Sequence, residues 1–284
     1  VYNMQALKNK VWVASGSVDG DKAFFDIKNG IYRFADGNWK TFNRENDSVY
    51  NQACVISSPA VSSVAIDPND PEHVFVASYG AGILEYQNDK GVRIYNTLNS
   101  TISQVTVSDS NDIRVGGLTF DGDGNLWAVT GYTISALTVK RASGGWFTYQ
   151  LPDPGLIDVV CFKPVVDDYG QKWFIGHKGA SNGAGLFVVK EASLSSNSGL
   201  KFKKYTNLKN YGNLPDLFVR SLAKDKDGAI WIGTNQGVAV VYNPGSVFDG
   251  TNYDAQKVII EQDGYAQYLL ETENVNAIAI DAAN

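Results

Sequence analysis

The stretch from Val219 to Tyr242 constrains the fold more than any other part of the chain. Its sequence, VRSLAKDKDGAIWIGTNQGVAVVY, contains three runs of β-favouring residues separated by Asp-Lys-Asp-Gly and Asn-Gln-Gly. Asp bonds to its own backbone in turns and Gly accepts a positive φ without steric cost, so both separators predict tight turns. No run has the apolar period of a helix. The stretch therefore predicts an antiparallel meander of three strands.

The same unit recurs along the chain, which indicates a repeat architecture. Three clear copies precede the one described above, the first copy of the chain is degraded, and the sixth stops before its aromatic strand. The copies begin at Asn3, Val61, Val115, Phe162, Val219 and Val275. The aspartates that anchor their turns recur every 47 to 57 residues, at Asp67, Asp121, Asp168, Asp225 and Asp281.

Each of the first five copies also contains a fourth predicted strand, with aromatic or β-branched residues two or three places apart. These strands are at residues 39–42, 92–95, 146–149, 202–205 and 258–260. Four strands per period of this length are typical of a β-propeller blade. The sequence therefore predicts an all-β fold, a β-propeller of four-stranded antiparallel blades. It predicts a single domain over residues 1–284, with five repeats plus the first strand of a sixth, from a parent ring of seven blades.

The second strand of most copies carries a tryptophan, and Phe75 takes its place in the second copy. A four-stranded sheet cannot bury both faces alone, so these side chains are predicted to fill the space between blades rather than to stack on a ligand. In a ring of more than five blades, residues 275–281 would lie at an open edge. In a closed ring of five they would pair with residues 11–15, and the larger ring is the preferred interpretation.

Composition excludes several classes of function. The chain has 24 Lys and Arg against 30 Asp and Glu, a net charge of −6, which gives no electrostatic basis for binding nucleic acid. No apolar stretch is long enough to span a bilayer. The two histidines, His73 and His177, are 104 positions apart and lack ligand-spaced partners, so no metal or other cofactor is predicted. Cys54 and Cys161 lie in different repeats and are predicted to be buried thiols rather than a disulfide.

Loop lengths point to one face of the predicted disc. The long, dissimilar loops are residues 15–29, 43–59, 96–112 and 176–185, and variable loops on a rigid scaffold often carry binding residues. Phe24 and Phe25 in the first loop either cover a blade end or form an exposed contact patch, and covering is preferred. The run Gly176–Gly185 is interpreted as a flexible blade edge, because a phosphate-binding loop would be followed by a helix. Asp121-Gly-Asp-Gly-Asn is interpreted as a turn, since no glutamate ends a calcium loop there.

A weak set of ligand-binding candidates follows from this geometry. Arg114 and Arg220 begin innermost strands, which places them at the mouth of the predicted channel. They are either solvated channel residues or, with Lys178, an anion-binding group. The full set of candidates is Tyr79, Arg114, Tyr132, His177, Lys178 and Arg220.

The motif Asp-x-Asp-Gly-x-Ile/Leu-Trp-Ile-Gly-Thr, clearest at residues 225–234, resembles the two-component-regulator propeller repeat of Bacteroidota. Residues 69–86 and 268–281 resemble the second propeller of PorZ-type proteins of the type IX secretion system. That resemblance implies a non-enzymatic protein of the periplasm or cell surface, with any signal peptide upstream of this chain. It also implies a partner that is either an anionic lipopolysaccharide or a protein of the secretion and attachment complex.

Three functions are weighed on this basis. The preferred one is a non-catalytic extracytoplasmic scaffold. The alternative is the glycan-sensing periplasmic ectodomain of a hybrid two-component regulator, which uses the same repeats. A propeller enzyme is disfavoured, because acid–base chemistry needs converging titratable groups and the carboxylates fall mainly at repeated turn positions.

Overall fold

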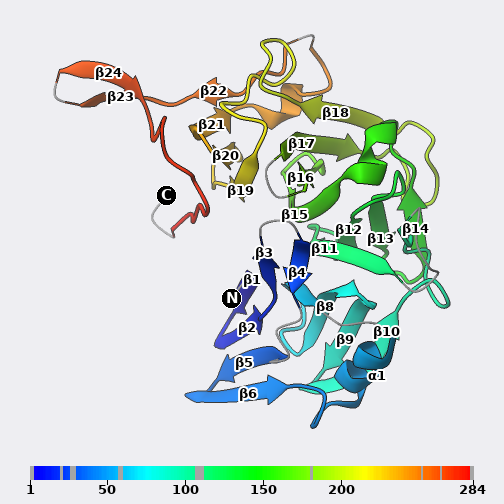
Figure 1. Cartoon of the computed structure of the whole chain (residues 1–284). Helices are drawn as coiled ribbons and strands as arrows, with labels where there is room; N and C mark the ends of the chain where they lie inside the picture. The colour runs from blue at the N-terminus through cyan, green and yellow to red at the C-terminus, as the bar shows by residue number, and fades with distance from the viewer. Residues whose placement is uncertain are drawn as a thin grey trace. The chain divides into compact units, whose positions relative to one another are not determined.

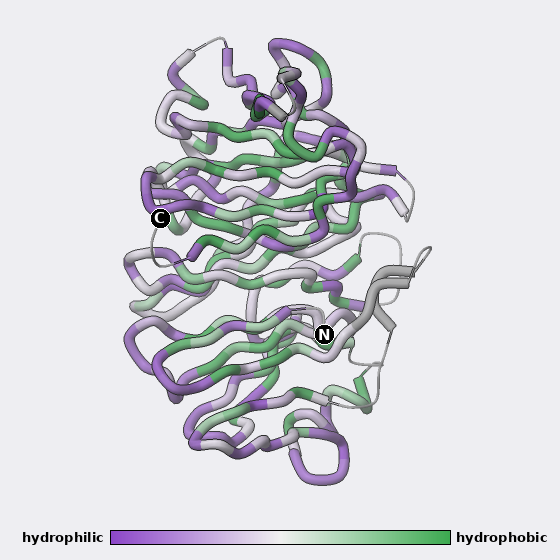
Figure 2. Tube along the Cα trace, turned by 90° about the vertical axis from the view of Figure 1, so that its left-hand side faces the viewer, coloured by the Kyte–Doolittle hydropathy of each residue, from purple (hydrophilic) through white to green (hydrophobic). Residues whose placement is uncertain are grey.

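The computed structural model describes residues 3–19, 22–25, 30–56, 60–105, 112–179, 182–250, 252–262 and 264–281 (Figure 1). The chain divides into two compact units. The first comprises Val1–Phe162 with Leu194–Ser196, and the second comprises Lys163–Ser193 with Asn197–Asn284. In both units the main element is a sheet of four antiparallel strands in sequential order, as the repeats predict. Figure 2 shows apolar residues gathered along the strands and polar residues at the turns.

The first unit contains three such sets of four strands, and the second and third sets are joined into one sheet of eight strands. Blade 1 has the order β1 (Asn3–Leu7), β2 (Lys10–Ala14), β5 (Ile31–Ala35) and β6 (Asn38–Phe42). Blade 2 consists of β7 (Ala60–Ile66), β8 (His73–Gly80), β9 (Gly82–Gln87) and β10 (Lys90–Tyr95). Blade 3 consists of β11 (Ile113–Phe120), β12 (Leu126–Thr130), β13 (Leu137–Lys140) and β14 (Trp146–Tyr149).

First strands of neighbouring blades lie next to each other in this unit. The side-chain oxygens of Asn3 and Gln5 in β1 accept hydrogen bonds from backbone N–H groups of β7 at 2.9 and 2.7 Å. The first strand of blade 3, β11, also pairs at its start with the end of β8, the second strand of blade 2, where Arg114 lies opposite Tyr79. Innermost strands that adjoin in this way are the arrangement that a propeller requires.

The second unit repeats the pattern twice. Blade 4 has the order β15 (Val160–Val166), β16 (Lys172–Lys178), β17 (Asn182–Lys190) and β18 (Lys201–Tyr205), and the first residues of β15 belong to the first unit. Blade 5 consists of β19 (Val219–Lys224), β20 (Ile230–Thr234), β21 (Gly237–Val241) and β22 (Gln256–Lys257). A separate hairpin follows, formed by β23 (Ile259–Gln262) and β24 (Tyr265–Tyr268).

Aromatic side chains of the second strands fill the space between blades, as predicted. Trp12 is fully buried in a cluster that joins blades 1 and 2, where it stacks on Phe42 at 5.1 Å and contacts Tyr86 of the next blade. Phe75 occupies the corresponding cluster between blades 2 and 3. In blade 5, Trp231 packs against a buried cluster that contains Val238, Val240 and Val275, and Ile278 packs against the same cluster.

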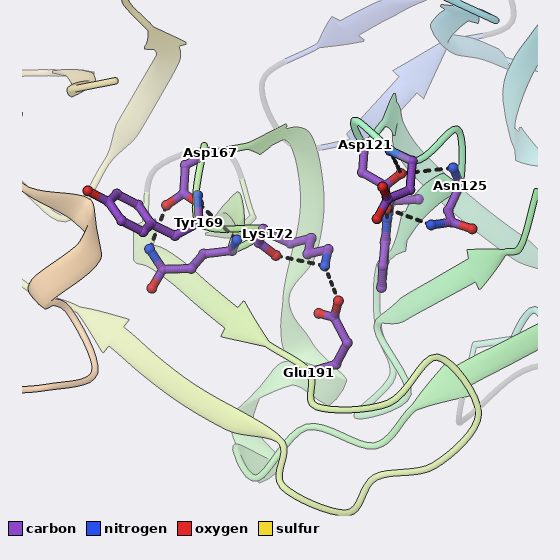
Figure 3. A network of polar contacts seen from close by, with 10 residues as sticks. Asp121, Asn125, Asp167, Tyr169, Lys172 and Glu191 are labelled. Carbon is purple, nitrogen blue, oxygen red and sulfur yellow. Dashed lines mark hydrogen bonds and ion pairs between the residues drawn. The ribbon is translucent and has the colours of Figure 1, made fainter. Parts of the chain in front are cut away.

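An aspartate fixes the tryptophan in three blades. The indole Nε1 of Trp127 donates to Asp121 at 2.7 Å, and that of Trp231 donates to Asp225 at 2.7 Å. In blade 4 the acceptor is Asp167, at 2.8 Å from the indole Nε1 of Trp173. Figure 3 shows Asp121 of blade 3 accepting hydrogen bonds from Asn125. The same carboxylates also accept backbone N–H groups of their own turns, so each one joins the turn to the core.

The anchoring residue of the fourth repeat is thus Asp167, and the prediction of Asp168 was wrong. Asp167 is buried and lies six residues before its tryptophan, as Asp121 and Asp225 do. Asp168 is exposed and pairs with Lys224 instead.

Other connections differ from their predictions as well. The predicted loop 43–59 contains helix α1 (Ser48–Ile56), capped by the Asp47 carboxylate, which accepts from the N–H of Tyr50. The loop 15–29 contains a hairpin of β3 (Ser17–Asp19) and β4 (Lys22–Phe25), and the side chains of Phe24 and Phe25 lie outside the described residues. Most of the glycine-rich run 176–185 is strand, because β16 and β17 pair as far as Lys178 and Asn182.

The end of the chain also departs from the repeat. The predicted fourth strand of repeat five, at residues 258–260, was wrong, because β22 pairs with β21 while Ile259 and Ile260 pair with β24. Residues 275–281 form no strand. Val275 instead bonds through its N–H to Thr234 and through its carbonyl to Ser221.

Candidate functional site

The candidate residues of the first unit form one group, here called the arginine–tyrosine cluster: Tyr79, Asp112, Arg114 and Tyr132. The cross-blade pairing of β8 with β11 brings Tyr79 beside Arg114. The Arg114 guanidinium lies over the Tyr132 ring at 4.7 Å and over the Tyr79 ring at 5.6 Å. Tyr132 follows β12 with φ of 59°, and its N–H donates to Val159 at 2.7 Å, which holds this uncommon conformation.

The positive charge of this cluster has an internal counterion. Arg114 Nε donates to both carboxylate oxygens of Asp112 at 3.1 Å, and Nη2 lies 2.9 Å from the same group. Burial disfavours the charged guanidinium, but the hydrogen bond to Asp112 together with the electrostatic effects of Tyr79, Asp112 and Tyr132 outweighs it, so the pKa of Arg114 is raised. Burial also raises the pKa of Tyr79 well above its usual value, so its phenol stays neutral. An anion that binds here must compete with Asp112.

Two of the three candidates in the second unit, with one residue not predicted, form the basic cluster: Lys163, His177 and Arg220. Arg220 is the extra residue of a β-bulge between Val219 and Ser221, and bulges redirect side chains. Its guanidinium lies over the Phe218 ring at 4.9 Å, and the His177 ring packs on the same phenylalanine at 3.9 Å.

Among the described residues, Lys163 and Arg220 donate their side-chain hydrogen bonds to neutral oxygens. The Lys163 ammonium donates to the Arg220 carbonyl at 2.8 Å, and His177 Nε2 lies 2.6 Å from the Val219 carbonyl. Arg220 Nε donates to Asn235 and Nη1 to Asn276, the latter at 3.1 Å.

Electrostatics in the basic cluster differ from those around Arg114. Burial, followed by the charge of Arg220, lowers the pKa of Lys163. Burial lowers the pKa of His177 to about 4, and the charges of Arg220 and Lys163 act in the same direction. His177 is therefore neutral near pH 7, and the cluster carries two positive charges. Lys178, the third candidate of this unit, is exposed at the end of β16.

Sequence reasoning missed Lys163, although the repeat contains a signal for it. The position four residues before the anchoring aspartate is Ser63, Gly117 and Ser221 in blades 2, 3 and 5. In blade 4 it is Lys163, a long charged side chain at a position that is otherwise small. Asp112 was missed because a sequence does not show which carboxylate faces an arginine.

A pocket of about 170 Å³ in the first unit lies near none of the six candidates. His73, on its wall, bridges Asp67 at 3.3 Å and Glu85 at 2.8 Å. The bond to Glu85 outweighs burial and raises the pKa of His73. In blade 2, Phe75 occupies the place of the tryptophan. There the contact of Asp67 with His73 takes the place of the aspartate–indole hydrogen bond found in blades 3, 4 and 5.

Comparison with known proteins decides the nature of the repeat. Residues 213–236 match the family described as two component regulator propeller. The chain carries a propeller repeat of this type. The matched segment includes Arg220 and the first two strands of blade 5, β19 and β20, and it agrees with the resemblance drawn from residues 225–234. No curated protein sequence matches the chain.

Solved structures give the same architecture. PorZ, an essential bacterial surface component of the type-IX secretion system of Porphyromonas gingivalis, is 20% identical with a TM-score of 0.78, over 99% of this chain and 38% of PorZ. The extracellular domain of the proposed hybrid two component system BT4673 from B. thetaiotaomicron is 16% identical with a TM-score of 0.56, over 84% of this chain and 26% of that one. At these identities the likeness confirms the β-propeller fold, and the chain spans well under half the length of either protein.

In the described part of the chain, no three or more His, Cys, Asp or Glu side chains are grouped as metal ligands would be. No helix within the described ranges has the length and apolar character of a membrane span. Cys54 and Cys161 do not form a disulfide, and burial raises the pKa of the Cys161 thiol.

Proposed function

We propose that this chain is a non-catalytic binding and scaffold module that acts at the periplasm or cell surface and recognises an anionic partner. One observation carries the proposal. In both clusters an arginine near the start of an innermost strand is held over an aromatic ring, at 4.7 Å for Arg114 and 4.9 Å for Arg220. A guanidinium that is already positioned loses little further freedom when an anion binds, which favours recognition.

The partner is proposed to be an anionic lipopolysaccharide or a protein of a type IX secretion and attachment complex. Support comes from the fold shared with PorZ, which is a surface component of such a system in its own organism. The alternative function is the glycan-sensing ectodomain of a hybrid two-component regulator. It is favoured by the propeller repeat at residues 213–236 and by the fold shared with an extracellular domain of that kind.

A pull-down of the full chain with outer-membrane lipopolysaccharide tests the preferred function. Arg114→Ala and Arg220→Ala are each expected to lower recovery. Arg93→Ala is the matched control, because Arg93 also lies over a ring, that of Tyr95 at 5.8 Å, but on the outermost strand β10. Equal recovery of all variants would remove these arginines from the proposed site. Release of sugar from the lipopolysaccharide by the chain would contradict a non-catalytic role.

The alternative predicts a different ligand preference. A sensor ectodomain should bind a soluble neutral oligosaccharide, measured by calorimetry, without retaining lipopolysaccharide. The preferred function predicts retention of lipopolysaccharide that weakens as salt is raised, since exposed charges are screened beyond about 8 Å at physiological ionic strength.

A further inference from the structure

The basic cluster brings two cations together, Lys163 and Arg220. Lys163 and Arg220 are both half-buried, and the partners they bond are a backbone carbonyl and two asparagine side chains. Among the described residues, no Asp or Glu forms an ion pair with either side chain. Fully buried charges in folded proteins are normally paired with opposite charge, and a half-buried charge is only partly compensated by water. The arrangement therefore favours the binding of an anion.

Lys163 takes the place of a small residue and makes its contact to the next blade through a charged group. In blades 2 and 5 the corresponding serines bond the segment that follows the blade: Ser63 Oγ accepts from the N–H of Leu118 in β11 at 3.2 Å, and Ser221 Oγ donates to the Val275 carbonyl at 2.7 Å. In blade 4 a lysine occupies this position with φ of 50°, in the left-handed region that such a residue rarely adopts. Backbone strain of this kind is concentrated at functional sites.

The charge of the cluster indicates which anion fits. His177 is neutral near pH 7, so Lys163 and Arg220 supply two positive charges. A phosphate monoester carries between about −1.5 and −2 charges at this pH, whereas a carboxylate carries one. Lysine provides a point charge for phosphate, and the guanidinium provides directed N–H donors.

We infer that Lys163 and Arg220 form a binding site for one phosphate group, with His177 and Phe218 as its neutral wall. The phosphate is either free or attached to a glycan or lipid. This inference deepens the proposed function, since Arg220 belongs to both, but it concerns Lys163 and the second unit alone.

Calorimetric titration of the full chain with inorganic phosphate in chloride buffer tests the site. Wild type is expected to bind one phosphate per chain. Lys163→Met and Arg220→Gln each remove one charge-assisted contact and are expected to weaken binding about tenfold or more. Lys209→Met is the matched control, because Lys209 is an exposed loop residue of the same unit, and it should bind like wild type. Absence of phosphate binding by wild type, or equal affinity of all variants, would overturn the inference.

Stability separates a binding role of Lys163 from a structural one. Without phosphate, Lys163→Met is expected to unfold in urea at or above the wild-type midpoint, because it removes a half-buried charge repelled by Arg220. A lower midpoint combined with unchanged phosphate affinity would make Lys163 a structural donor and contradict the site.

Lipopolysaccharide before and after phosphatase treatment identifies the source of the phosphate. Loss of retention after treatment indicates an attached phosphate group, whereas phosphate binding with equal retention indicates free phosphate. Both outcomes support the site. Retention of lipopolysaccharide without any binding of inorganic phosphate would overturn the site and leave the proposed function standing. Binding of inorganic phosphate without retention of lipopolysaccharide would overturn the proposed function and leave the phosphate site standing.

Discussion

Arg114 and Arg220 are each the second residue of an innermost strand, and each lies over an aromatic ring, yet their electrostatic surroundings are opposite. Arg114 is bound by the Asp112 carboxylate, while Arg220 is bound by asparagine oxygens and lies beside Lys163. The shared position in the repeat therefore determines where each arginine lies. The side chain next to it, a carboxylate for Arg114 and an asparagine for Arg220, determines whether the positive charge is available to a ligand.

The largest expected effect comes from giving Arg220 the counterion that Arg114 has. Asn235 accepts from Arg220 Nε, so Asn235→Asp introduces a carboxylate of the same shape at that contact. Phosphate affinity measured by calorimetry is expected to fall about tenfold or more, the size of one charge-assisted interaction. Asn252→Asp adds the same charge at an exposed site of the second unit and should have little effect. Unchanged affinity in Asn235→Asp would show that Arg220 is not a phosphate contact.

A second contrast concerns the histidines of the two units. Unfolded histidine titrates near 6.5 and His177 near 4, so the unfolded state takes up the proton first. Wild type should therefore lose stability as pH falls from about 6.5 to about 4, by roughly 1 kcal/mol after allowance for partial exposure. Urea unfolding of wild type and His177→Gln measures this, and the variant should have the flatter profile.

The effect of His73 on the pH dependence of stability has the opposite sign, because Glu85 and Asp67 raise its pKa. The stability it contributes is present below about 6.5 and is lost as pH rises through its folded value. His73→Gln should therefore lower stability mainly on the acidic side. Parallel profiles for both variants would contradict the different environments of the two histidines.

Removing Asp112, the counterion of Arg114, tests whether an unpaired arginine at this position binds anions more strongly. Asp112→Asn should make Arg114 resemble Arg220 and increase retention of anionic lipopolysaccharide about threefold, consistent with the modest worth of a partly exposed ion pair. Asp89→Asn is the matched control, since Asp89 pairs with Arg33 away from the cluster. Unchanged or weaker retention in Asp112→Asn would indicate that the arginine–tyrosine cluster does not contact the anion.

The smallest effect is expected at the aromatic ring. Tyr132→Asn removes the face below Arg114 while keeping a residue that tolerates positive φ. Retention should weaken about twofold, because a partly exposed cation–π contact is worth about 0.5–1 kcal/mol. Tyr265→Asn, at an exposed tyrosine of β24, should not change retention. A much larger loss at Tyr132 would mean that the ring itself contacts the ligand.

Much of the fold follows from local rules that a sequence displays. Turn residues and the tryptophans predict the four-stranded blades, because each blade is built from contacts close in sequence. Even so, Asp168 was predicted to be the anchoring aspartate of the fourth repeat, whereas its neighbour Asp167 has that role. Only the six-residue spacing to tryptophan, shared with Asp121 and Asp225, distinguishes the buried acceptor from the exposed one.

The site was less accessible to sequence reasoning, because its defining contacts are long-range. Lys163 meets the carbonyl of Arg220, a residue 57 positions away. Whether a charge is opposed depends on such contacts, and no local pattern encodes them. Helix α1 was missed for a related reason, since a nine-residue segment has a weak period and is stabilised by packing of Val49, Tyr50 and Ala53.

The charge state of Lys163 tests the central claim most directly. Its pKa can be measured by NMR titration of the full chain labelled on lysine side chains, with and without inorganic phosphate, and assigned by the Lys163→Met variant. An unopposed, half-buried ammonium beside Arg220 should have a pKa below the ordinary value of 10.5, and phosphate should raise it. An ordinary pKa that phosphate does not change would contradict the account, because the charge would then be solvated and available to no ligand in particular.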